Sequence, residues 1–142
     1  MQSNISTAPV SKTALWAGRI LSGIVALFLF LASVMDLAKS ASAVEGMVHY
    51  GYPESSLAGI GVALLVSVVL YLVPRTSVLG AILLTGYLGG AVATHVRAGD
   101  PLFRMLVPVL FGLLAWGGLY LRDDRLRALV PFCRPRSSTV IP

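Results

Sequence analysis

Four long runs of apolar residues, separated by short polar segments, dominate the sequence, at residues 16–38, 57–73, 78–97 and 102–121. A helix needs about 20 predominantly apolar residues to cross a bilayer, so each run is predicted to be a membrane-spanning helix. Only residues 74–77 separate the second run from the third, so these two helices are predicted to be antiparallel neighbours. The pattern predicts an all-α, integral membrane four-helix bundle over residues 16–121. Residues 1–15 and 122–142 are then tails.

The third apolar run carries a stripe of small residues on one side. Gly86 and Gly90 are separated by one helical turn, Ala93 and Thr94 continue the same face, and Arg97 ends it. Small side chains allow two helix backbones to approach closely inside a membrane. We therefore predict that Gly86 and Gly90 are helix-packing positions.

Composition agrees with a membrane location. Hydrophobic residues make up 56% of the chain, charged residues 12%, and the mean hydropathy is +0.83. An average soluble domain carries about 25% charged residues. The net charge is +5, but no basic stripe is interleaved with aromatic residues, which excludes nucleic acid as the expected partner. The expected surroundings are a lipid bilayer.

The basic residues predict the orientation of the helices. With four crossings, eight basic residues lie on the side of both termini and three on the other side. Cytoplasmic segments carry the excess of Lys and Arg, so both tails are predicted to be cytoplasmic and the protein to be a multi-pass plasma membrane protein. The first group is Lys12, Arg19, Arg75, Arg122, Arg125, Arg127, Arg134 and Arg136, and the second is Lys39, Arg97 and Arg104.

An alternative interpretation of the first run is a secretory signal peptide. Basic residues precede the run, and Ala41-Ser42-Ala43 resembles a cleavage site. The run is longer than a usual signal core, however, and the charges of Asp36 and Lys39 interrupt its end. These features favour an uncleaved first helix.

The candidate functional residues gather at the predicted outer end of the bundle: Asp36, Lys39, Thr94, His95 and Arg97. Ionisable residues within or near membrane spans are costly and therefore suggest function. Asp36 and Arg97 each end a face of small residues, so we predict that they form a charge pair within a polar pocket. The alternative is that these side chains are anchors whose charged ends reach water at the membrane surface.

No metal site is predicted. His49 and His95 are the only histidines and lie on the same side, but nothing in the sequence marks a haem pocket around them. Cys133 is the only cysteine, which excludes an internal disulfide, and it lies in the basic tail without a partner.

Several segments together resemble the DoxX-like family of small bacterial four-helix membrane proteins: residues 35–39 (MDLAK), 51–53 (GYP), 79–97 and 116–123 (WGGLYLRD). The resemblance implies an uncleaved first helix, a bacterial inner-membrane location and a link to quinone-linked oxidoreductases, with quinone as the candidate cofactor. Whether the protein is an enzyme stays open. Three function classes remain: an oxidoreductase subunit, a small carrier or channel, and a structural or assembly protein. A homo-oligomer or other membrane subunits are the expected protein partners.

Overall fold

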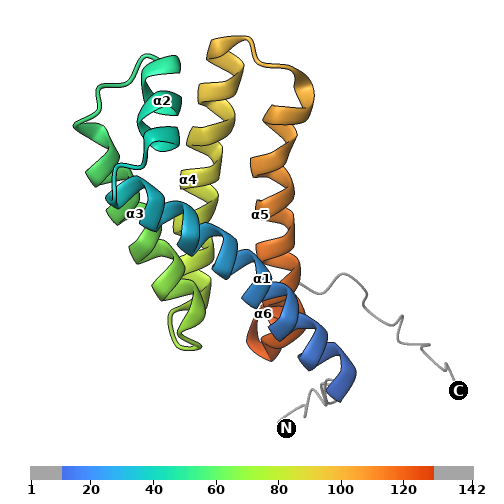
Figure 1. The fold of residues 1–142 in the computed structure, drawn as a ribbon. Coiled ribbons are helices and arrows are strands. Elements are labelled where there is room, and N and C mark those ends of the chain that lie inside the picture. The colour runs from blue at the N-terminus through green and yellow to red at the C-terminus, as the bar shows by residue number, and fades with distance from the viewer. Residues whose placement is uncertain (1–10, 130–142) are drawn as a thin grey trace, which may run out of the picture.

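The structure is a computed structural model that describes residues 11–129, and these residues form helices joined by turns (Figure 1). No strand occurs among them, so the prediction of an all-α protein is confirmed. The helices are α1 (Lys12–Leu37), α2 (Ala41–His49), α3 (Ser56–Leu72), α4 (Ser77–Ala98), α5 (Leu102–Arg122) and α6 (Asp124–Leu129).

The four long helices pack in a ring. Helix α1 packs against α3 and α5, and α4 on the opposite side also packs against α3 and α5. Figure 1 shows α1 crossing the other helices obliquely, so that α2 stands beside α4 at the end of the bundle that α1 does not reach. The core lies between the long helices and is formed mainly by Val25, Leu29, Leu64, Val68, Leu84 and Leu119.

Helices α1, α4 and α5 are long and apolar enough to cross a membrane, by length and composition. Helix α3 is equally apolar in character but has 17 residues, which makes it the shortest of the four. Large apolar side chains are exposed along the outside of the helices, including Ile24, Leu27, Phe28, Leu110 and Leu113. Such a continuous apolar exterior suits lipid and not water, so the chain is an integral membrane protein. A full crossing by α3 stays a prediction.

Two features of the helices differ from the sequence-based prediction. Helix α1 begins at Lys12 and not near Trp16, because Ser11 caps it: the Ser11 Oγ accepts a hydrogen bond from the Ala14 amide at 3.2 Å. Residues 40–56 were expected to be a hydrophilic connection, but they contain α2. The Ser40 Oγ caps this helix by accepting from the Ala43 amide at 3.3 Å. Helix α2 has nine residues and none of them is buried, so it gives no long apolar run of the kind that predicts a membrane helix.

The closest contact between α3 and α4 involves Gly80. A Cβ at this position would overlap the backbone N and Cα of Tyr71. Tyr71 is fully buried, and its hydroxyl is within hydrogen-bond distance of the Ser22 Oγ at 2.9 Å and the Ala115 carbonyl at 2.8 Å. One phenol thus connects α1, α3 and α5 inside the bundle, where an unpaired hydroxyl would be costly.

Candidate functional site

A cavity of about 510 Å³ lies at the end of the bundle that contains α2. Its walls come from the end of α1, from α2 and the following turn, from Ile60 of α3, and from one side of α4 between Gly86 and His95. No Cα atom of α2 lies within 8 Å of a Cα atom of α4, so the cavity separates these two helices. Its volume falls in the range of small-molecule sites, about 300–1,000 Å³.

Gly86 and Gly90 form part of the α4 wall and are not packed against another helix of the described chain. A Cβ at either position would meet nothing within 4 Å, and both residues are exposed. The prediction that they are helix-packing positions is therefore not supported within this chain. The glycine that allows close packing on α4 is Gly80, about two turns before Gly86 and three before Gly90. Gly86 and Gly90 instead keep the cavity open toward the side of the bundle.

Asp36 lies at the end of α1 and lines the cavity. It is half-buried, and its carboxyl group makes no hydrogen bond or ion pair with the residues that the structure describes. The expected pair with Arg97 is absent from these residues, and the Arg97 guanidinium contacts the Tyr50 carbonyl and the Tyr52 ring instead. Lys39 does not reach Asp36 either: its Nζ lies 3.2 Å from the Oε1 of Glu54, in an exposed ion pair. An ionisable group without a hydrogen-bond or ion-pair partner near the end of a candidate membrane span suggests function.

A polar cluster of Tyr50, His95 and Asp100 lies at the end of the cavity beside the turn between α4 and α5. The Tyr50 hydroxyl donates to the Asp100 Oδ2 at 2.8 Å, and the His95 Nδ1 lies 2.6 Å from the same oxygen. The Tyr50 ring also meets the His95 ring edge-on, with centroids 5.2 Å apart. The sequence marked His95 as a candidate functional residue. In the structure it joins this cluster and lines the cavity.

The cluster shifts two pKa values in opposite directions. The hydrogen bond from His95, and then the one from Tyr50, lowers the pKa of Asp100 below its usual value of 3.8. Burial, together with the neighbouring Asp100 carboxylate, raises the pKa of the Tyr50 phenol above its usual value of 10.0. Asp100 is therefore charged at neutral pH, and Tyr50 remains a hydrogen-bond donor.

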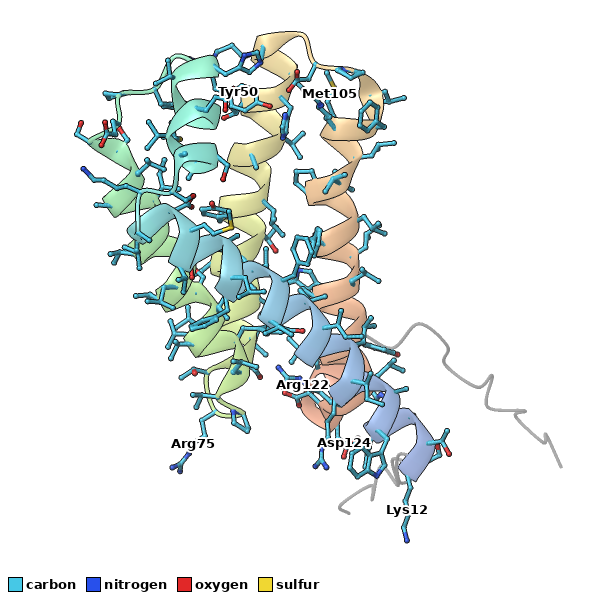
Figure 2. All side chains as sticks on the ribbon, in the orientation of Figure 1. Lys12, Tyr50, Arg75, Met105, Arg122 and Asp124 are labelled. Carbon is cyan, nitrogen blue, oxygen red and sulfur yellow. The ribbon has the colours of Figure 1, made fainter. Side chains whose placement is uncertain are left out.

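Arg97 and Thr94 hold the turn after α2 against α4. The Arg97 Nη2 donates to the Tyr50 carbonyl at 2.7 Å, and its guanidinium lies 5.0 Å from the centre of the Tyr52 ring. The Tyr52 Oη and the Thr94 Oγ1 are 3.0 Å apart. With the Tyr50–His95–Asp100 cluster, these contacts form a latch between the C-terminal end of α2 and the end of α4. Figure 2 shows Tyr50 at this end of the molecule, away from Lys12 and Arg75.

Residues with unusual backbone angles flank α2. Lys39 before it has a φ of 48°, and Gly51 after it has a φ of 76°. Such left-handed conformations are rare for a lysine and readily accepted by glycine. Helix α2 is therefore a short, sparsely packed segment between two sharp changes in chain direction, fixed to α4 by the latch.

Sequence reasoning did not identify Tyr50, Tyr52 or Asp100 as parts of the site. His49 and His95 do not face each other; His49 packs against Tyr50, with ring centres 5.0 Å apart. Among residues 11–129, no group of three or more His, Cys, Asp or Glu side chains could hold a metal ion. Cys133 lies outside the described residues.

The fold and the cavity define a small helical membrane protein with a site at one end. The chain belongs to the DoxX-like family, whose sequence model matches residues 20–118. This match covers most of α1, all of α2 to α4 and most of α5, and so includes every residue of the cavity wall. Comparison with curated proteins and with solved structures gave no match.

Proposed function

We propose that this protein is a membrane subunit of a quinone-linked oxidoreductase and that its cavity binds the quinone head group. The observation that supports the proposal best is the composition of the cavity. Apolar and small residues form most of the wall, with the Asp36 carboxyl on one side and the hydroxyls of Tyr52 and Thr94 near the outer end. A few polar groups in an apolar cavity suit a flat ring with two carbonyl oxygens.

The shape of the opening also suits a quinone. Gly86 lies near the middle of α4, so the cavity extends from about the centre of the membrane to its surface. The exposed surfaces of Gly86 and Gly90 leave it open at the side of the bundle. An isoprenoid tail could extend through this opening into lipid while the head group stays among the polar side chains.

The ionisable groups suit proton transfer at such a site. Reduction of a quinone to a quinol takes two electrons and two protons. In the proposed arrangement the electrons come from a partner subunit that carries a flavin or a metal centre. Asp36 lies inside the cavity as a proton donor or acceptor, and the Tyr50–His95–Asp100 cluster lies between the cavity and water. This chain then binds the head group and exchanges protons with it.

The proposal is tested by quinone binding to purified protein. We expect a short-chain quinone to raise the thermal stability of the protein in detergent, and native quinone to be extracted with it. Gly90→Leu should abolish the stabilisation, because the new side chain would enter the cavity. Gly89→Leu is the matched control, since Gly89 also has nothing within 4 Å but does not line the cavity. Equal stabilisation of the two variants, or none of the unmodified protein, would contradict the proposal.

A second candidate, an assembly protein, is favoured by one observation. Gly86, Gly89, Gly90 and Ala93 are exposed on α4, and small exposed residues suit contact with another membrane helix. A channel has no comparable support, because Ala81 and Leu84 are buried on α4 between the cavity and the opposite end of the bundle.

A further inference from the structure

The opposite end of the bundle contains another cavity, of about 720 Å³, which shares no lining residue with the first. Three arginines from three different parts of the chain line it: Arg19 from α1, Arg75 from the turn between α3 and α4, and Arg122 from the end of α5. Figure 2 shows Arg75 and Arg122 at the same end as Lys12. Residues far apart in sequence thus concentrate positive charge around one hollow.

These arginines are not neutralised by the residues that the structure describes. None of the three forms an ion pair there, although Asp123 and Asp124 also line the cavity, leaving three positive against two negative side chains. Arg122 donates from Nη2 to the Tyr71 carbonyl at 2.7 Å, and its Nε is buried without a hydrogen-bond partner. Arg75 is exposed at the cavity edge.

The first turn of α4 adds a second feature that attracts anions. Ser77 and Val78 line the cavity, and Thr76 before them does not cap the helix. The Thr76 Oγ1 donates to the Leu70 carbonyl at 2.9 Å instead. The first amides of this 22-residue helix therefore have no capping side chain, and the positive end of its dipole lies beside the arginines.

We propose that this cavity binds a phosphate group, namely the head group of an anionic phospholipid. Arginine forms paired hydrogen bonds with phosphate oxygens, and helix N-termini stabilise the same charge. The cavity lies where the apolar helices end, which is the depth of lipid head groups, and basic hollows between membrane helices bind such lipids. The proposal does not depend on the quinone site, which lies at the other end.

The experiment compares lipid retention by native mass spectrometry after reconstitution in phosphatidylcholine with and without phosphatidylglycerol. We expect phosphatidylglycerol to be retained by the unmodified protein and bound about five-fold more weakly by Arg75→Gln, or by Arg19→Gln, as about 1 kcal/mol for each interfacial arginine implies. Lys12→Gln is the control, because it removes one charge from the same end but does not line the cavity. It should bind the lipid normally.

A parallel titration with inorganic phosphate, in phosphatidylcholine alone, identifies the source of the phosphate. Retention of phosphatidylglycerol without a response to phosphate supports the lipid head group. If the protein binds inorganic phosphate but not phosphatidylglycerol, and Arg75→Gln abolishes this binding, the ligand is a soluble phosphate. That result would overturn the assignment of the cavity to a lipid head group. Equal weakening by Lys12→Gln and Arg75→Gln would show a diffuse surface charge, and no preference for phosphatidylglycerol would show no lipid site. Both results would overturn the proposal.

Discussion

Gly80→Ala tests whether the bundle depends on one close contact between α3 and α4. The added Cβ would overlap the backbone N and Cα of Tyr71 and would lie 2.6 Å from the Leu70 carbonyl carbon. Backbone atoms cannot rotate away as a flexible side chain can, so the two helices must separate. Overpacking of this kind costs about 1–3 kcal/mol. Movement of Tyr71 also strains its buried hydrogen bonds, worth about 0.5–1.5 kcal/mol each.

The matched control is Gly86→Ala on the same helix. A Cβ there meets nothing within 4 Å, so the substitution should be neutral or should stabilise the helix by up to about 1 kcal/mol. Thermal unfolding of both variants and the unmodified protein, followed by circular dichroism in one detergent, measures the difference. We expect Gly80→Ala to unfold at a clearly lower temperature and Gly86→Ala not to. Equal losses would refute this reasoning. A loss for Gly86→Ala alone would show that another chain covers the glycine face of α4, as the assembly alternative requires.

Two further predictions concern orientation and the latch. In a Cys133→Ser background, Glu54→Cys should react with an impermeant maleimide added to intact cells and Arg75→Cys only after lysis; the reverse result would overturn the orientation with cytoplasmic tails. The second prediction is that the latch stays formed above pH 3.8, the usual pKa of an aspartate. The pKa of Asp100 is lowered in the folded protein, so the stabilisation from its charged form is lost as the pH falls through that lowered value. After correction for the intrinsic pH dependence of exchange, the protection of the α2 amides should therefore fall only below about pH 4. The same response in Asp100→Asn would exclude Asp100 as the cause.

The long helices were predictable because lipid imposes a simple rule on sequence. A membrane helix must be apolar for about 20 residues, and the four apolar runs correspond closely to α1, α3, α4 and α5. Helix α2 was not predictable in this way. Its nine residues are too few to span a membrane, and it is held by the Ser40 cap and by contacts at its other end, which depend on where α4 lies.

Three of the five candidate site residues line one cavity, and that this cavity is the functional site stays a prediction. Asp36, Thr94 and His95 line the cavity as a group, as their clustering at one end suggested. The predicted Asp36–Arg97 pair was wrong. A sequence shows which face of a helix carries a residue, but it does not show how that helix is tilted, and α1 runs obliquely across α3 (Figure 1). At Gly61, a Cβ would come within 3.1 Å of the Asp36 Cβ, so the end of α1 lies against α3 and away from Arg97. The actual partners of Arg97 come from the turn after α2.

The cavity itself follows from the same small residues that suggested helix packing. Stripes of small side chains have two physical outcomes: two backbones approach, or a space stays empty between them. Around Gly80 the first outcome holds, because only a short turn joins α3 to α4 and draws them together. Around Gly86 and Gly90 the second holds, since no other helix of the described chain packs against them and the facing wall also contains small residues at Ala43 and Gly46. The cavity at this end of the bundle therefore exists because small residues line its walls. The polar side chains of Asp36, Thr94 and His95 supply the groups that could bind a ligand there.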